Sequence, residues 1–360
     1  MAHLSFLSTI YPPRLNHVTE SWPQSVDYQP AVQIRVEDGY HVSLMVAYGR
    51  ASYGESPVRY RDAGRARARY PDDGAIAQSL ILARGPKKGE AMKVHIISDM
   101  EGVSGIVKWE QVTGGHAMYE EGRRLYTEEI NAAIRGARAA GATEIVVMDC
   151  HGAGGPWSFN SMVPELLDPT CEYVVQGEWT EYTAFLEQGC DAALFVGMHA
   201  RAGTQNGVMN HTVSGQAWQN LWFNGKLVGE TGINAALCGT WGCPVVLVTG
   251  DDVTCREAED LLGSGLTTVA VKQGLGRFSA RQIPPVRARR MIEEGARAAL
   301  RDLRAVAAYN PGKPCEIVVE FTRTEAFDEY RRRPGLEVSG DRRLTVRAGD
   351  WWTAWRQFFC

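Results

Sequence analysis

The sequence predicts an α/β fold with a mostly parallel sheet, helices on both of its faces (a three-layer arrangement), and a smaller C-terminal α+β lobe. Short apolar runs of the length of buried strands occur at residues 94–97, 144–148 and 192–196. Between the first two runs, apolar residues recur at helical spacing, and a strand-helix-strand order of this kind joins parallel neighbours. Beyond residue 270 an amphipathic helix is followed by two separate strand patterns, which predicts the smaller lobe.

Composition sets wide limits. The chain has 360 residues and a formal net charge of −4, so it can bury a large core, and nothing in its charge favours a nucleic-acid partner. No apolar run approaches the length of a membrane-spanning helix. The eight cysteines include no C-x-x-C pair, and several lie within strand or helix patterns. We therefore expect reduced thiols, a cytoplasmic location and no membrane partner.

Residues 1–91 differ from the rest of the chain. They contain no cysteine, an arginine-rich polar run at 59–69, and a linker-like segment at 85–90. We expect a disordered extension or a mis-assigned start, with the functional protein beginning near Met92. The alternative is a small N-terminal domain built on apolar segments at 32–36 and 42–46. The remainder divides, on this interpretation, into an α/β domain at 92–270 and the smaller lobe at 271–360.

The elements of the predicted α/β domain follow in order from the strand at 94–97. A helix is predicted over 119–140, because Tyr126, Ile130, Ala133 and Ala137 share one face and Gly141 ends the pattern. After the strand at 144–148, the pattern favours a short helix at 162–167, a brief strand at 173–175, a helix at 178–188 and the strand at 192–196.

The second half of the chain begins with a hairpin at 221–228, since Asn224-Gly225 is a strong signal for a tight turn. A helix at 233–237, a strand at 244–248, a helix at 253–262, a turn at 274–277, a helix at 286–307 and strands at 316–321 and 344–346 follow. Asp350 is placed to cap a last helix that begins at Trp351.

Charged and imidazole side chains follow each of the first three strands. Asp99 and Glu101 come after the first; because side chains two apart in an extended chain point the same way, these like charges are expected to share a cation. His151 follows the second strand and His199 the third. Open α/β sheets bind ligands outside the carboxyl ends of their strands, so these residues are expected to converge.

The full candidate set adds residues from later segments: Asp99, Glu101, His151, His199, His211, Glu230, Asp251 and Asp252. Mixed carboxylates and imidazoles suit zinc, and also manganese, cobalt or iron. The set exceeds what one tetrahedral ion needs, and two ions sharing a bridging carboxylate would use it.

Simpler roles compete for some residues. A lone histidine after a strand is more often structural than a ligand, and Asp149 could be a hydrogen-bond partner of His151. Asp251-Asp252 precedes a predicted helix, so capping is the simpler role. His95 is expected in the core and His116 in a loop.

Five ordered segments resemble the zinc-dependent D-aminopeptidases of the DppA type, peptidase family M55. They are Ser98-Asp99-Met100-Glu101-Gly102, Asp149-Cys150-His151, Gly197-Met198-His199-Ala200-Arg201, Gly207-Val208-Met209-Asn210-His211 and Val228-Gly229-Glu230. The likeness runs from Met92 to the C-terminus. The family pattern usually has serine at the positions of Cys150 and Asn210, and the loop between His199 and His211 is one residue longer here.

The resemblance implies a hydrolase that releases N-terminal D-amino acids from short peptides. It implies two zinc ions per chain held by Asp99, Glu101, His151, His199 and Glu230, with Asp99 bridging. His211 is implied to be catalytic, described in the family as a nucleophile; a proton shuttle or a group that steadies the tetrahedral intermediate is the alternative. The resemblance further implies a homo-oligomer that encloses its site.

Two other functions remain open from the residues alone. One is a dinuclear metallohydrolase of another amide or of a phosphoester, for which Arg201 and Arg277 are the candidate phosphate-binding side chains. The other is a non-catalytic dipeptide-binding protein linked to transport.

Overall fold

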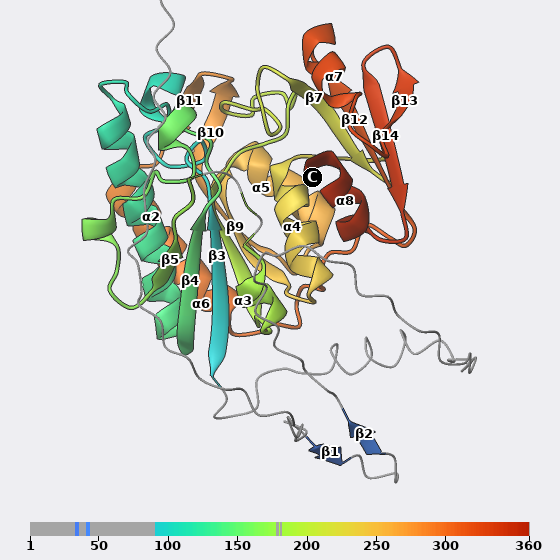
Figure 1. Ribbon diagram of the computed structural model, residues 1–360. Helices are drawn as coiled ribbons and strands as arrows, with labels where there is room; N and C mark the ends of the chain where they lie inside the picture. Colours follow the sequence, from blue (N-terminus) through green and yellow to red (C-terminus); the bar gives the residue numbers. More distant parts are fainter. Residues whose placement is uncertain (1–32, 36–40, 44–90, 178–179, 181, 360) are drawn as a thin grey trace, which may run out of the picture. The chain divides into compact units, whose positions relative to one another are not determined.

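The computed structural model describes residues 33–35, 41–43, 91–177, 180 and 182–359 (Figure 1). In the first of the chain's two units, β1 (Gln33–Arg35) pairs antiparallel with β2 (His41–Ser43). These strands overlap the segments 32–36 and 42–46 noted above. The predictions of a disordered extension, a mis-assigned start and a linker concern residues 1–91, most of which lie outside the described part of the chain.

The main sheet of the second unit has seven strands in the order β11-β10-β9-β6-β3-β4-β5. All neighbours pair parallel except β10 and β11, so the predicted mostly parallel sheet is confirmed. Its strands are β3 (Met92–Ser98), β4 (Ala142–Asp149), β5 (Glu172–Val174), β6 (Ala192–Met198), β9 (Val245–Asp251), β10 (Thr267–Gly276) and β11 (Ser279–Gln282).

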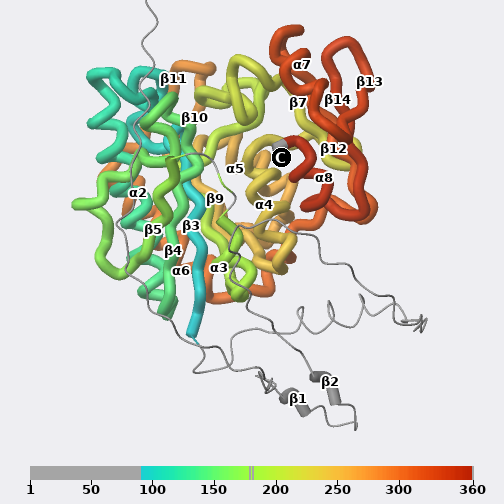
Figure 2. Tube along the Cα trace, in the orientation of Figure 1, coloured from blue at the N-terminus to red at the C-terminus, as the bar shows by residue number. Residues whose placement is uncertain are grey.

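Helices cover both faces of this sheet, which confirms the three-layer arrangement (Figure 2). On one face α2 (Tyr119–Ala139) and α6 (Pro285–Ala299) pack over strand residues such as Ile96. On the other face α3 (Ala184–Glu187), α4 (Glu230–Thr240) and α5 (Asp252–Leu262) contribute to a second core that includes Phe195. The burial of apolar side chains on both faces explains why the central strands read as continuous apolar runs.

A second, antiparallel sheet has the order β13-β14-β12-β7-β8. Its strands are β7 (Trp218–Phe223), β8 (Lys226–Val228), β12 (Cys315–Phe321), β13 (Glu337–Gly340) and β14 (Arg343–Ala348), and α7 (Thr324–Tyr330) and α8 (Trp351–Phe359) accompany it. Trp218, Phe223 and Trp355 form an aromatic core there. The segments 92–270 and 271–360 each contribute strands to both sheets, since β7 and β8 precede residue 270 while β10 and β11 lie mainly beyond it.

Several predicted helices are shorter than their patterns indicated. The helix predicted at 178–188 is limited to α3 among the described residues, and upstream the Gln176 side chain accepts the Thr180 amide, a local bond that competes with a helix. α6 ends at Ala299 rather than at residue 307. Just beyond its end, the Asp302 side chain accepts the Arg304 amide, a local bond that competes with a helix. At 162–167 there is only a 3-10 turn, Pro164–Leu166. The predicted turn at 274–277 was wrong in part, because β10 continues through Gly276.

The helix predicted at 233–237 extends three residues further at each end as α4, and β10, β11, α7 and β13 were not predicted as elements. Asp350 accepts the Thr353 amide and so caps α8 as predicted, and Asn224-Gly225 joins β7 to β8. No helix in the described part of the chain combines the length and apolarity that a membrane span requires.

Candidate metal centre

The loop after β3 is joined to the end of β6 by backbone hydrogen bonds. The Asp99 amide donates to Val196 O at 2.9 Å, and the Gly102 amide to Gly197 O at 2.8 Å. A Cβ at Gly102 would lie 1.9 Å from Met198 O, so only glycine permits this approach. Gly197 has a φ of +75°, which also favours glycine. The two glycines therefore bring Asp99 and Glu101 beside His199.

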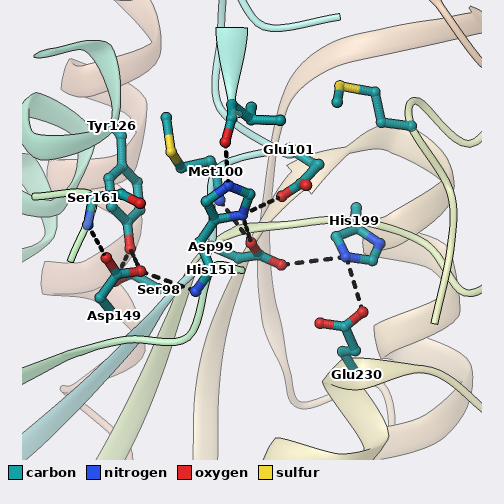
Figure 3. Close-up of polar contacts among 12 residues, drawn as sticks. Ser98, Asp99, Met100, Glu101, Tyr126, Asp149, His151, Ser161, His199 and Glu230 are labelled. Atoms are coloured by element: carbon teal, nitrogen blue, oxygen red, sulfur yellow. Dashed lines mark hydrogen bonds and ion pairs between the residues drawn. The ribbon is translucent and has the colours of Figure 1, made fainter. Parts of the chain in front are cut away.

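Asp99 lies between two imidazole rings (Figure 3). Its Oδ1 is 3.1 Å from His151 Nδ1, and its Oδ2 is 3.3 Å from His199 Nε2. Glu101 Oε2 is 3.0 Å from His151 Nδ1, and Glu230 Oε1 is 3.3 Å from His199 Nε2. The five residues thus form two groups that share one carboxylate, and four of them are almost fully buried.

Backbone carbonyls determine which nitrogen of each histidine faces these carboxylates. His151 Nε2 donates to Val112 O at 2.7 Å, and His199 Nδ1 donates to Ala200 O at 2.9 Å. Because a carbonyl oxygen only accepts, those nitrogens carry the hydrogen. In the neutral rings, the lone pairs of His151 Nδ1 and His199 Nε2 then point at carboxylate oxygens, an arrangement that needs a cation between them.

The pKa shifts of the residues in the two groups are consistent with a cation-binding site. Burial alone would lower the pKa of His151, but the Glu101 and Asp99 carboxylates raise it well above its usual value. Burial likewise opposes a rise in the pKa of His199, which Glu230 and Asp99 raise. Burial would raise the pKa of Asp99, yet the hydrogen bonds of His151 and His199 hold it well below its usual value. The site strongly favours positive charge among ionised carboxylates.

His211 completes the cluster from the loop that precedes β7. Its ring stacks on that of His199 with centroids 4.0 Å apart, and its Nδ1 donates to Met209 O at 2.9 Å. Its Nε2 lies 3.8 Å from Glu230 Oε1. Met209 and Val213 have φ values of +52° and +58°, so the backbone on both sides of His211 adopts the left-handed conformation.

Asp149 supports the site through hydrogen bonds to the segments around it. Its Oδ1 accepts the His151 amide at 2.9 Å and the Tyr126 hydroxyl at 2.9 Å, and its Oδ2 accepts the Ser161 amide. Asp149 is thus a hydrogen-bond partner of His151, one of the roles that the sequence left open, and it orients the backbone that carries the ring. Burial raises the pKa of Asp149.

Among the other candidates, Asp251, His95 and His116 behave as their simpler roles predicted. Asp252, in contrast, is the first residue of α5 and bonds to β10 instead of capping the helix. Asp251 caps α5 by accepting the Thr254 amide at 2.7 Å, and Asp252 accepts the Gly274 amide. His95 is fully buried and bonds to Val146 O, and His116 is exposed in a loop.

The cluster opens into a cavity of about 960 Å³. Its lining includes Asp99, Glu101, His151, His211 and Glu230. Trp109, Asn234, Arg277 and Trp355 also line it, and only Arg277 was singled out from the sequence, as a phosphate-binding candidate. Their positions have no local signature, because they come from a 3-10 turn, a helix interior, a hairpin turn and the C-terminal helix.

Lys272 is a further residue that sequence patterns did not reveal. It is 2% exposed, and its Nζ donates to the backbone oxygens of Glu101, Val103 and Ile106 at 2.6, 2.9 and 2.7 Å. Lysine is seldom fully buried, so its place within an apolar strand was the available signal. It anchors the loop that carries Glu101.

The donor set fits zinc. Glu101 Oε2 and His199 Nε2 are buried, and the polar atoms closest to them among the described residues belong to the cluster itself, His151 Nδ1 for the first and the Asp99 and Glu230 carboxylates for the second. Ligand atoms of Asp99, Glu101 and His199 lie within 4.8 Å of one another, as do those of His199, His211 and Glu230. Mixed imidazole and carboxylate donors, with each imidazole hydrogen-bonded through its other nitrogen, are typical of zinc sites.

Comparison with known proteins gives consistent results. Residues 92–360 match peptidase family M55, described as D-aminopeptidase. A D-aminopeptidase of Bacillus subtilis (strain 168) is 33% identical over 264 residues, which cover 72% of this chain and 92% of that protein. A solved structure, the Zn-dependent D-aminopeptidase DppA from Bacillus subtilis, described as a self-compartmentalizing protease, superposes with a TM-score of 0.69 at 32% identity. That match covers 74% of this chain and 96% of the other.

Proposed function

The chain belongs to peptidase family M55, the D-aminopeptidases, and we propose that it uses two zinc ions to release N-terminal D-amino acids, such as D-alanine, from short peptides. The observation that carries the two-ion assignment is the position of Asp99, whose two oxygens face different histidines. A carboxylate so placed would be able to serve as a ligand to both ions.

The five proposed ligands fall into the two groups described above, and each group would hold one ion. Asp99, Glu101 and His151 are assigned to one ion, and Asp99, His199 and Glu230 to the other. The Val112 and Ala200 carbonyls hold the imidazoles in the tautomers that leave Nδ1 of His151 and Nε2 of His199 free to coordinate.

When bound, zinc supplies a Lewis acid that polarises the scissile carbonyl and lowers the pKa of a water molecule. His211 is the catalytic residue in this proposal. Its Nδ1 is held by Met209 O, so its Nε2 can take a proton from the attacking group and return it to the leaving amine. A carboxylate of the site or a metal ion would anchor the free α-amine of the substrate. The preference for D-amino acids rests on the family.

The surroundings support the remaining parts of the proposal. The seven described cysteines are free thiols, which fits a cytoplasmic protein, and the substrate partner is a short peptide rather than a nucleic acid or a membrane. Homo-oligomers that enclose the site are proposed by analogy with the self-compartmentalizing relative. Light scattering of the purified chain tests this directly.

The central experiment compares D-alanyl and L-alanyl amides of otherwise identical structure as substrates of the zinc-loaded full chain, with zinc counted per chain. We expect two zinc ions, and at least about 100-fold faster cleavage of the D form, since a mismatched group in a shaped site costs several kcal/mol. The His211→Ala variant should lose turnover by a factor of about 100 or more while keeping its zinc.

His116→Ala is the matched control, because His116 is an exposed loop residue outside the cavity lining. It should retain both zinc and activity. Loss of zinc in His211→Ala would assign His211 to metal binding instead. Cleavage of phosphoesters but not amides would favour another metallohydrolase, and tight dipeptide binding without turnover would favour a transport-linked binder.

A further inference from the structure

The charges that line the cavity are unevenly placed. Asp99, Glu101 and Glu230 supply the carboxylates, and Arg277 is the only lysine or arginine among the described residues of the lining. Arg201, the other candidate noted in the sequence, lies outside this lining and pairs with Glu257. The carboxylates are the ligands proposed for zinc, so the Arg277 guanidinium is the separate polar feature of the cavity, and it is complementary to an anionic group of the ligand.

Arg277 lies in the turn between β10 and β11, and this turn is hydrogen-bonded to the loop that carries His211. Its carbonyl oxygen accepts the Met209 amide at 2.6 Å, and Met209 O in turn accepts from His211. The guanidinium carbon lies 5.9 Å from the Trp109 ring centroid and 5.4 Å from that of Phe278. These aromatic faces restrict the side chain without using its hydrogen-bond donors.

No carboxylate in the described part of the chain forms an ion pair with Arg277. Its forked donors match a carboxylate in a two-bond geometry, which a lysine could not reproduce. The guanidinium is therefore available for an anionic group of a ligand in the cavity.

Arg277 lies close to His211, which limits the length of a ligand that could reach both. A Cβ built on Gly215 would lie 3.6 Å from His211 Cβ and 3.8 Å from Arg277 Nη2, so Gly215 occupies the gap between the two side chains. Trp109 contacts both as well, with its ring 5.4 Å from that of His211. An extended peptide covers roughly 3.3–3.6 Å per residue, so a carboxylate one residue beyond the scissile bond would reach the guanidinium.

We propose that Arg277 binds the C-terminal carboxylate of the substrate, and that the cavity thereby selects zwitterionic dipeptides over longer or C-terminally blocked peptides. The assignment rests on the proposed peptidase function for its orientation: the α-amine lies toward Glu230 and the carboxylate toward the β10–β11 turn. Arg277 is a specificity-determining residue that takes no part in bond cleavage.

The test measures binding and cleavage separately. The binding probe is a ketomethylene analogue of D-alanyl-D-alanine, in which CH2 replaces the scissile NH, with either a free carboxylate or a carboxamide at its end. Calorimetric titration of the zinc-loaded full chain should show about tenfold or tighter binding of the carboxylate form, as expected for a charge-assisted bidentate pair. Arg277→Gln should abolish that difference.

Arg281→Gln is the matched control, since Arg281 is exposed on β11 of the same hairpin and does not line the cavity. It should keep the preference. In cleavage assays, Arg277→Gln should raise KM for D-alanyl-D-alanine about tenfold with little change in kcat, and leave the carboxamide substrate unaffected.

Equal binding of the two analogues by the unmodified chain, or a preference that survives in Arg277→Gln, would overturn the proposal. A failure of the peptidase function gives a different result: neither D-alanyl substrate would be cleaved. The analogue titration would still decide whether Arg277 binds a carboxylate.

Discussion

Replacing Lys272 by methionine tests how the loop that carries Glu101 is held. The Lys272 ammonium donates to three backbone carbonyls, those of Glu101, Val103 and Ile106, across a span of six residues. Methionine has a similar length and is apolar, so the variant keeps the packing and removes the three donors. Any loss of stability therefore reports on the hydrogen bonds and the charge.

The expected loss of stability in the Lys272→Met variant follows from two opposing contributions to the free energy of unfolding. The variant removes the donor to the Glu101 carbonyl, which costs about 1–3 kcal/mol, whereas Val103 O still accepts the Ile106 amide and Ile106 O still accepts Gln282 Nε2. Against this, the variant no longer buries an ammonium, a cost reflected in the pKa of Lys272, which burial lowers to about 8. Breaking a buried charged network from one side typically costs about 3–5 kcal/mol, and we expect the lower end of that range.

Urea denaturation of the full chain measures this loss, and a thermal midpoint lower by about 6–12 °C should accompany it. Zinc retention against a chelator should also weaken, because Glu101 lies on the loop that Lys272 anchors. Lys226→Met is the control: Lys226 is exposed and donates only to Asp260 O at 3.2 Å, so its loss should stay within about 0.5 kcal/mol. Equal stability of the two variants would refute the anchoring role.

Three further perturbations test other parts of the structure. Gly102→Ala places a Cβ 1.9 Å from Met198 O and should destabilise the fold by about 3 kcal/mol or more in urea, whereas Gly349→Ala, with open space around it, should not; similar midpoints for both would contradict the close approach of the loops. Burial raises the pKa of Glu129 from 4.5 to about 7, so its protonated form stabilises the fold fully below pH 4.5 and that contribution is lost as the pH rises through 7. Glu129→Gln should remove this pH-dependent loss of stability, worth about 3 kcal/mol. The same difference in the free energy of unfolding between pH 5 and pH 8 in the variant and in the unmodified chain would count against the assignment. Removing zinc by chelation should lower the thermal midpoint by several degrees and abolish activity, both restored by added zinc; His199→Ala should show no such zinc-dependent shift in midpoint, since stabilisation by a ligand follows its occupancy.

Much of the fold could be predicted from local patterns. The apolar runs at 94–97, 144–148 and 192–196 became β3, β4 and β6, because a strand covered on both faces needs apolar side chains throughout. The helix that became α2 was predicted within about one residue, since its apolar face and Gly141 both act locally. The residues placed at the strand ends also converge as the parallel arrangement requires.

The sequence by itself determined which residues meet at the candidate metal centre: Asp99, Glu101, His151 and His199 follow their strands directly, and a strand end fixes where its next residues lie. The tertiary structure alone decided that β6 lies between β3 and β9, that β12 joins β7, and that Asp149 holds the backbone of His151 rather than its ring. It also decided that Lys272 anchors the Glu101 loop and that Arg277 stands across Gly215 from His211. These contacts join segments distant in the chain, and their energies depend on packing between elements, which no local periodicity encodes.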